Sequence, residues 1–452
     1  MDGLLNAITN LNEVLWSSVL LVLLLGTGIF FTIRLKFVQV RKFGEGFKRV
    51  FGGINLKGKK AGKDGMSSFQ AVATAIAAQV GTGNLAGAAT AIAAGGPGAI
   101  FWMWVSAFLG MSTIYAEAVL AQLFKTRVEG EVTGGPAYYI KNGIKNKKIG
   151  GFLSVFFAIS CTLALGFMGN AVQANSISDA FNNSFGVSPL IVGIIVSIIG
   201  GFVFFGGMGR IASVTEKVVP FMAGMYILVG VIVIAMNGNQ LLPAFKAIFV
   251  GAFNPQAVVG GAIGITIRQA VRYGVSRGLF SNEAGMGSTP HAHAVANVKH
   301  PSEQGSVAIV SVFIDTFVIL TLTALVIITS GALNEGNLTG IQLTQRAFEL
   351  TLGGFGDVFV AICLLFFAFS TIIGWYFFGE NNIKFLFGKK GLTPYRILVM
   401  IVVIIGSTLK VDLVWQLADT FNGLMVIPNL IALLVLSRLV VKATKDYDEL
   451  KK

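Results

Sequence analysis

Long apolar blocks are the feature that most limits what this chain can fold into. Eight segments consist almost entirely of apolar residues: Leu15 to Ile33, Phe156 to Ala174, Leu190 to Phe205, Val218 to Met236, Ala308 to Ser330, Val358 to Phe378, Ile397 to Gly406 and Leu413 to Leu436. A helix needs about 20 residues to cross about 30 Å of hydrocarbon. Only 12% of the residues are charged, whereas a soluble domain has about a quarter. The pattern predicts an all-α polytopic membrane protein, because a β-barrel would instead have short alternating segments.

The basic residues indicate topology. They concentrate in the segments 34–63, 125–148, 384–396 and 438–452, whereas the loops expected at 179–188, 237–254 and 332–356 contain almost none. Cytoplasmic loops carry the excess of Lys and Arg. We therefore predict a multi-pass protein of the cell membrane with an outside N-terminus and a cytoplasmic C-terminus. The net charge of +13 then indicates contact with anionic lipids of the bilayer and no role in nucleic-acid binding.

Eleven spans can be drawn with every basic loop in the cytoplasm. They lie near residues 15–33, 67–94, 99–124, 151–178, 189–205, 215–236, 255–297, 305–331, 355–380, 394–409 and 412–440. We accordingly divide the chain into four parts. Residues 1–66 form an N-terminal helix and a basic loop, 67–236 a first five-helix repeat, 255–440 a second repeat of inverted topology, and 441–452 a cytoplasmic tail.

Two of these spans contain glycine-rich interruptions, QVGTGN at 79–84 and YGVSRG at 273–278. Glycine weakens a helix, and unwound backbone inside a bilayer persists only where protein or a water-filled cavity satisfies it. The interruptions occupy corresponding positions in the two repeats, which is the pattern expected of discontinuous helices at a transporter binding site. The alternative is that these glycines serve only close packing of helices.

Three segments resemble the alanine/glycine:cation symporter family: GTGNLAG at 81–87, GGPGAIFWMWVSAFLG at 95–110 and SNEAGMGSTPHAHA at 281–294. The resemblance implies sodium-coupled import of alanine or glycine by alternating access. It also implies a LeuT-type 5+5 inverted repeat with two discontinuous helices and one extra N-terminal helix. We expect sodium as the co-transported ion, no organic cofactor, and activity as a monomer.

A zwitterionic substrate needs hydrogen-bond donors for its carboxylate and acceptors for its ammonium group. The N-terminus of a half-helix supplies donors, which here would be Thr82, Gly83 and Asn84. The similarity of the GTGN run to its counterpart in LeuT-type transporters implies that the amides of Thr82 and Gly83 bind the carboxylate. Asn170 is a candidate acceptor for the ammonium group, or alternatively makes a structural bond between helices. The predicted substrate site comprises Gln79, Thr82, Gly83, Phe167, Asn170, Tyr273, Gly274, Ser276 and Trp375.

The resemblance also implies where sodium binds. One ion would lie between the carbonyls of Ala77 and Val80 and the hydroxyls of Ser370 and Thr371, and a second cation would lie near Asn84. The alternative for the two hydroxyls is a bond to their own helix.

Ionisable residues inside the predicted spans are functional candidates. They are Glu117, Arg268, Arg272, Arg277, Glu283 and Asp315. Pairing among them would neutralise most of them. Arg277 and Glu283 would otherwise form a gate, and Asp315 would hold a cation or carry a proton.

Two other classes of protein compete with a symporter. His291 and His293 are spaced wrongly for one face of a zinc-binding helix, so we expect no enzyme. A proton-coupled amino-acid transporter and a channel or facilitator stay as alternatives.

Overall fold

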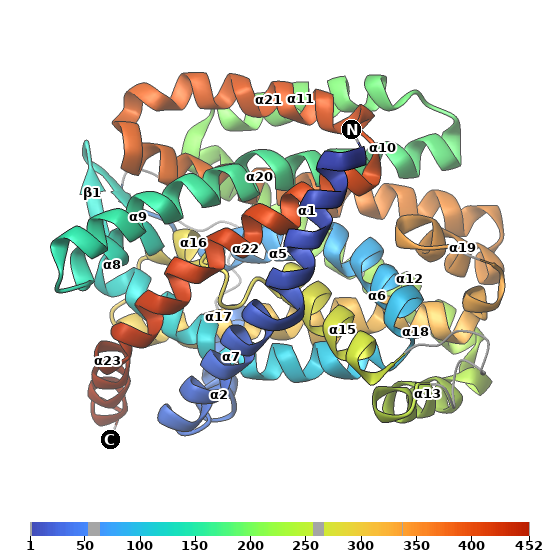
Figure 1. The fold of residues 1–452 in the computed structure, drawn as a ribbon, viewed down its shortest axis with the longest axis horizontal. Helices are drawn as coiled ribbons and strands as arrows, with labels where there is room; N and C mark the ends of the chain where they lie inside the picture. The colour runs from blue at the N-terminus through green and yellow to red at the C-terminus, as the bar shows by residue number, and fades with distance from the viewer. Residues whose placement is uncertain (1, 53–63, 256–265, 337, 452) are drawn as a thin grey trace.

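The computed structural model describes residues 2–52, 64–255, 266–336 and 338–451. Helices dominate this part of the chain, as predicted (Figure 1). The exception is a hairpin of β1 (Thr126–Val128) and β2 (Glu131–Thr133), which are antiparallel. Residues 53–63 of the first basic loop, and residues 256–265 of the span expected at 255–297, lie outside the described residues.

The helices of the N-terminal half include π-helical turns, which are labelled η together with the 3-10 helices. They are α1 (Asp2–Val14), η1 (Leu15–Val19), α2 (Leu20–Arg34), α3 (Val38–Arg41), α4 (Phe43–Gly52), α5 (Ser68–Gln79), η2 (Gly83–Gly87), α6 (Ala88–Gly95), α7 (Ala99–Leu123), α8 (Pro136–Gly143), α9 (Lys147–Cys161), η3 (Thr162–Gly169), α10 (Asn170–Phe185), α11 (Pro189–Phe204) and α12 (Gly207–Met236).

The C-terminal half continues in the same way. Its helices are η4 (Gly238–Gln240), α13 (Leu241–Phe253), α15 (Ile267–Asn282), α16 (Pro290–Ala294), α17 (Pro301–Val312), η5 (Phe313–Leu320), α18 (Thr321–Ser330), η6 (Ala332–Asn334), α19 (Gly340–Leu352), α20 (Gly354–Phe387), η7 (Gly388–Gly391), α21 (Leu392–Thr408), α22 (Val411–Val435) and α23 (Ser437–Glu449). Two segments that we expect to be loops therefore contain helices, α13 and α19.

Six helical stretches of the described chain are long and apolar enough to cross a membrane. They are Ala99–Leu123, Lys147–Phe185, Gly207–Met236, Pro301–Ser330, Gly354–Thr408 and Val414–Val435. Leu20–Arg34 and Pro189–Phe204 are shorter apolar helices. The outer face of α11 exposes large apolar side chains, including Ile191, Ile195, Ile198 and Phe202. A continuous apolar surface of this kind suits lipid better than water.

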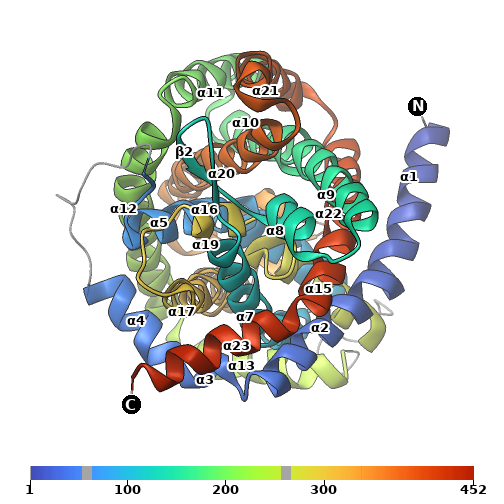
Figure 2. The ribbon, with the colours of Figure 1, turned by 90° about the vertical axis from the view of Figure 1, so that its left-hand side faces the viewer.

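The first predicted interruption is confirmed. Helix α5 ends at Gln79, Val80 has extended backbone, and helical structure resumes at Thr82 and Gly83. The side chain of Ser67 begins α5 by accepting a bond from Gln70 N, so both ends of this short helix have a local cause. Figure 2 shows α5 and α16 in the interior, enclosed by the longer helices.

The second interruption was predicted at the wrong place. Helix α15 runs without a break through residues 273–278 and ends at Asn282, and the irregular segment is 283–289. Gly274 and Gly278 are packing glycines, because a Cβ on Gly274 would collide with the Ala99 carbonyl and one on Gly278 would lie 3.0 Å from Ser106 Oγ. Gly285 and Gly287 make the break, with φ of +86° and +82° that favour glycine.

The described parts of the four basic segments meet at one end of the molecule. Arg127 pairs at 2.8 Å with Asp64, which directly follows the first basic segment. Lys389 lies 3.5 Å from Glu131 of the hairpin, and Arg41 lies 3.3 Å from Asp448 of the tail. Burial opposes ionisation of Glu45 in α4, but hydrogen bonds from Lys451, Tyr447 and Arg49 hold its pKa below the usual value. The contacts of Glu45 tie α4 to α23 at this end.

Candidate functional site

The two interrupted helices meet at their breaks. Gln79 at the end of α5 donates from Nε2 to the Asn282 carbonyl at 2.7 Å. Gly83, which begins the next half-helix, lies against the last turn of α15, since a Cβ there would be 3.0 Å from Ser281 Cα. The positive N-terminal end of one half-helix therefore lies beside the negative C-terminal end of another. Such an arrangement suits a ligand that carries both charges.

The backbone of the first break is held by side-chain amides. Asn84 Oδ1 accepts from Gly81 N at 2.9 Å, and Gln173 Oε1 of α10 accepts from Thr82 N at 3.1 Å. Gln173 was missed by the sequence analysis. It is a buried amide on the helical face of Asn170, three residues away, and this spacing is the signal that would have found it.

Three of the predicted substrate residues contain buried polar atoms without a hydrogen-bond partner in the described part of the chain. They are Gln79 Oε1, Thr82 Oγ1 and Asn170 Oδ1. Leaving a buried polar atom unsatisfied costs about 1–3 kcal/mol, so natural proteins rarely do it without a reason. A bound polar ligand is the kind of partner that would satisfy such atoms.

The predicted sodium ligands come together. Thr371 Oγ1 lies 2.9 Å from Ala77 O and 3.3 Å from Val80 O, and Ser370 Oγ lies 3.3 Å from Ala77 O. These are four oxygen atoms at the C-terminal end of α5, where the helix dipole favours a cation. The hydroxyls also contact Phe367 O of their own helix, so the alternative bond is present as well.

A second polar cluster surrounds Asp315. This fully buried carboxylate accepts from Asn84 Nδ2 at 2.7 Å, Ser281 Oγ at 2.9 Å and Thr316 Oγ1 at 2.8 Å. The three partners come from η2, α15 and η5. Asn84 and Asp315 are separate candidate cation ligands in the sequence, and the structure brings them into contact.

Glu117 and Glu283 lie at the second break. Glu117 of α7 accepts from the amides of Gly285 and Gly287 at 3.0 and 2.9 Å, and from Asn429 Nδ2 at 2.6 Å. Glu117 thus holds the irregular backbone in place. Glu283 accepts from Trp375 Nε1 and from Ser288 Oγ.

The expected pairing among the intramembrane charges is wrong. Within the described chain no salt bridge joins Glu117, Glu283 or Asp315 to a basic side chain. Arg277 instead pairs with Asp419 of α22 through two contacts of 3.0 and 3.2 Å, and its guanidinium lies over Trp415. Asp419 was not among the predicted functional carboxylates, although it lies inside the predicted span 412–440.

Three other predicted residues lie away from the break. Tyr273, Gly274 and Ser276 lie on the continuous part of α15, and Tyr273 packs under the guanidinium of Arg272 instead. They were predicted to form the second break at 273–278, but that break lies further along the chain, at 283–289.

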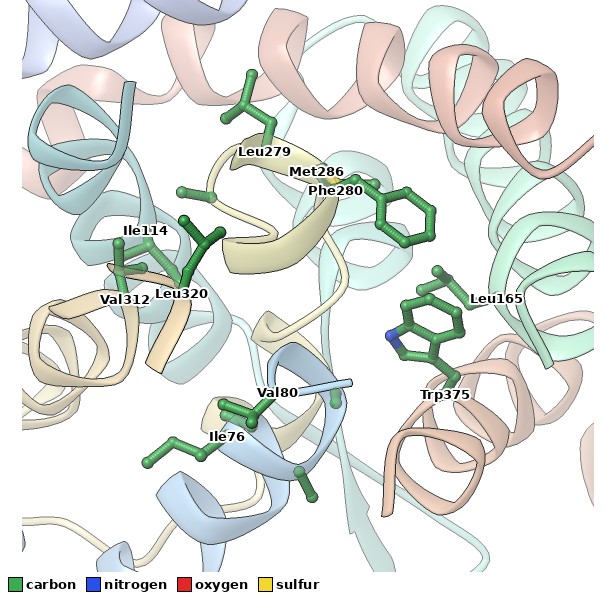
Figure 3. Close-up of a cluster of buried hydrophobic side chains, with 14 of the residues drawn as sticks. Ile76, Val80, Ile114, Leu165, Leu279, Phe280, Met286, Val312, Leu320 and Trp375 are labelled. Carbon is green, nitrogen blue, oxygen red and sulfur yellow. The ribbon is translucent and has the colours of Figure 1, made fainter. Parts of the chain in front are cut away.

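Aromatic residues connect the breaks with the Arg277–Asp419 pair. Phe280 lies 5.9 Å from Trp375 and 5.0 Å from Trp415, measured between ring centroids. Figure 3 shows Trp375, Phe280 and Val80 around one central region.

Phe167 is half-buried and meets the ring of Tyr395 edge-on. Beyond Trp415 lies a cavity of 370 Å³, lined among others by Thr90, Asn175 and Arg277.

Comparison with known proteins decides the family. The model of the sodium:alanine symporter family matches residues 1–452. The chain belongs to this family. It is 45% identical over 449 residues to the sodium/alanine symporter AgcS of Methanococcus maripaludis, covering 98% of this chain and 97% of the relative. It is 44% identical to the probable sodium/glutamine symporter GlnT of Bacillus subtilis, covering 98% and 90%.

A solved structure is similar in fold alone. The crystal structure of a mutant manganese transporter of Eremococcus coleocola gives a TM-score of 0.52 at 15% identity, covering 81% of this chain and 75% of that chain. This member of the sodium:alanine symporter family is therefore a multi-pass membrane protein and a cation-coupled amino-acid symporter. The family consists of transporters and not of enzymes.

Proposed function

We propose that this symporter imports a small neutral amino acid, alanine or glycine, together with sodium by alternating access. The observation that carries the proposal is the group of oxygens from Ala77, Val80, Ser370 and Thr371 beside the first break. Hard cations such as sodium bind oxygen ligands, and released carbonyls with hydroxyls are a suitable set. The names of the relatives support sodium, since AgcS is a sodium/alanine symporter and GlnT a probable sodium/glutamine symporter.

The substrate site that we propose lies between the two breaks. The carboxylate would bind the amides of Thr82 and Gly83, with Gln173 helping to position this backbone. Asn170 Oδ1 would accept from the ammonium group, and Phe167 and Trp375 would form walls around a small side chain. A second cation would bind at Asp315 and Asn84.

The interior charge supports cation coupling in general. Glu117, Glu283 and Asp315 are fully buried and have no salt bridge in the described chain. A buried carboxylate of this kind can be neutralised by a bound cation or by a proton, so these groups suit coupling to a cation in general. A proton could play this part in place of a second sodium ion, and a relative from Bacillus subtilis is named a putative sodium/proton-dependent alanine carrier.

We further propose a LeuT-type fold of eleven spans, with the N-terminus outside, the C-terminus in the cytoplasm and a monomer as the active unit. Residues 67–236 and 255–440 would be the two inverted repeats, preceded by residues 1–66 and followed by the tail at 441–452. The contacts that gather the basic segments at one end support this orientation. The Arg277–Asp419 pair would then act as the outer gate.

Uptake into liposomes tests the proposal. Purified protein should accumulate labelled alanine above equilibrium when sodium is higher outside, and unlabelled alanine or glycine should compete. Thr371→Val removes one ligand and should raise the sodium concentration for half-maximal uptake about tenfold or more, equal to about 1.4 kcal/mol. Thr329→Val is the matched control, because Thr329 is buried but bonds to Leu325 O of its own helix at 2.7 Å.

Three results would contradict the proposal in distinguishable ways. Equal uptake with potassium in place of sodium would remove sodium coupling. Accumulation driven by a proton gradient alone would favour the proton-coupled alternative. Uptake that never exceeds equilibration would favour a channel or facilitator.

A further inference from the structure

The backbone at Glu283 is unusual for an interior residue. Glu283 is the C-cap residue that follows α15, with φ of +58° and ψ of +11° in the left-handed region. Four described non-glycine residues have positive φ, and the other three, Lys36, Phe37 and Glu129, have exposed side chains. Left-handed backbone costs an L-residue about 1–2 kcal/mol, and the same loop uses glycine at 285 and 287. A side chain kept at such a position suggests a function for that side chain.

The carboxylate of Glu283 is fully buried but only partly engaged. It accepts one bond from Trp375 Nε1 and one from Ser288 Oγ, both from neutral donors. An ionised carboxylate has about four acceptor sites. In the part of the chain that the structure describes, no lysine or arginine pairs with it. A buried carboxylate is costly without a positive partner, and a ligand can be that partner.

Glu283 lies close to residues of the first break. The preceding residue, Asn282, accepts from Gln79 of the first break, and Trp375 is the residue that donates to Glu283. The six-membered ring of Trp375 also packs on Gly169, where a Cβ would lie 2.5 Å from Trp375 Cζ3. Gly169 immediately precedes Asn170, the other candidate acceptor. Glu283 also lies at the C-terminal end of α15, where the helix dipole favours a positive group.

We propose that Glu283 is the charged acceptor for the α-ammonium group of the substrate. This inference rests on the proposed function, because it assumes that the zwitterion binds between the two breaks. The carboxylate end of the zwitterion lies at the N-terminal amides of the first half-helix, and the ammonium end lies at Glu283 and the last carbonyls of α15.

The assignment predicts selectivity for the ammonium group itself. Lactate has the carboxylate and the methyl group of alanine, but a hydroxyl in place of the ammonium group. It would leave Glu283 buried without a positive partner, so the wild-type protein should bind it at least about a hundredfold more weakly than alanine. This range corresponds to the loss of one charged hydrogen bond, together with the unpaired charge that stays behind.

Calorimetry on the full-length protein in detergent with saturating sodium tests this assignment. We expect Glu283→Gln to weaken alanine binding about tenfold to a hundredfold, and to reduce the preference for alanine over lactate. The sodium affinity of the variant in the absence of alanine, measured by tryptophan fluorescence, should differ from that of the wild type by less than threefold. The matched control is Glu216→Gln, which changes a buried glutamate of α12 that accepts from Gln70 Nε2 at 2.9 Å. It should leave both affinities within twofold.

Several outcomes would overturn the proposal. If the wild-type protein binds lactate with an affinity within tenfold of its alanine affinity, the proposal is wrong. This test needs no variant, so it applies even if Glu283→Gln fails to fold. Unchanged alanine affinity in Glu283→Gln, with loss of the proton movement that accompanies uptake, would make Glu283 a proton carrier. Loss of sodium binding would make it a cation ligand. Sodium-independent uptake by the wild-type protein would instead refute the proposed function. The liposome uptake assay detects this outcome separately from the binding measurements.

Discussion

The Arg277–Asp419 pair gives a prediction about gating that can be worked out from the structure. The guanidinium of Arg277 on α15 meets both carboxylate oxygens of Asp419 on α22, at 3.2 and 3.0 Å. The two side chains are 15% and 13% exposed, so the pair is neither a surface ion pair nor a fully buried one. If it closes the outer side of the central site, Asp419→Asn should raise the population of the outward-open state.

The size of this effect follows from the burial of the pair. Surface pairs contribute about 0–1 kcal/mol, and breaking a buried pair costs about 3–5 kcal/mol. An intermediate value of about 1–3 kcal/mol corresponds to a shift of about 5-fold to 150-fold in the equilibrium between closed and open states. The contact between Arg277 and Trp415 persists in the variant and keeps the shift toward the lower end.

Cysteine accessibility measures this shift directly. Both native cysteines, Cys161 and Cys363, are buried and unpaired, so a cysteine introduced by Thr82→Cys should be the main target of a charged thiol reagent added outside. Thr82 is fully buried at the first break. Combined with Asp419→Asn, it should react about 5-fold to 150-fold faster than Thr82→Cys alone.

A matched control separates the gate from general charge effects. Glu335→Gln breaks a solvent-exposed pair with Arg346 and leaves the Arg277–Asp419 pair intact, so it should leave the labelling rate within twofold. Equal rates for the Asp419→Asn and control backgrounds would refute the gate. So would faster labelling in both, because that result would indicate a general loosening of the fold.

Two further predictions concern the structural carboxylates. The pKa of Glu45 is lowered in the folded state, so its contribution to stability is present above the usual carboxyl pKa and is lost as the pH falls through the lowered value. The melting temperature of the wild type should therefore fall on acidification. The melting temperature of Glu45→Gln should be lower at neutral pH and fall less on acidification. Parallel curves of melting temperature against pH would contradict this account. Glu117→Gln puts an N–H group against the amide of Gly285 or Gly287 and should destabilise the protein by about 1–3 kcal/mol in denaturant or thermal unfolding. An unchanged stability would show that the glycine amides find other partners.

Features that depend on local chemistry were predictable from the sequence. Apolar length predicted a helical membrane protein, because the cost of burying backbone in lipid leaves few alternatives. The GTGN segment predicted the first break, since two glycines and a short amide side chain act within a few residues of one another. The hydroxyls of Ser370 and Thr371 were linked to Ala77 and Val80 by resemblance, and the structure brings these residues into contact.

The second break and its partners were decided by tertiary structure. A glycine is the same letter whether it gives room to a neighbouring helix, as Gly274 does against Ala99, or adopts positive φ, as Gly285 does. Only the packing of α15 against α7 distinguishes the two uses. Charge pairing is similarly non-local, because Arg277 meets Asp419 across 142 positions of the chain. The sequence by itself thus determined that this protein is a helical membrane protein and where its first helix break lies. The tertiary structure decided which carboxylates have a partner, because a pair forms only where two distant helices bring the groups within a few ångströms.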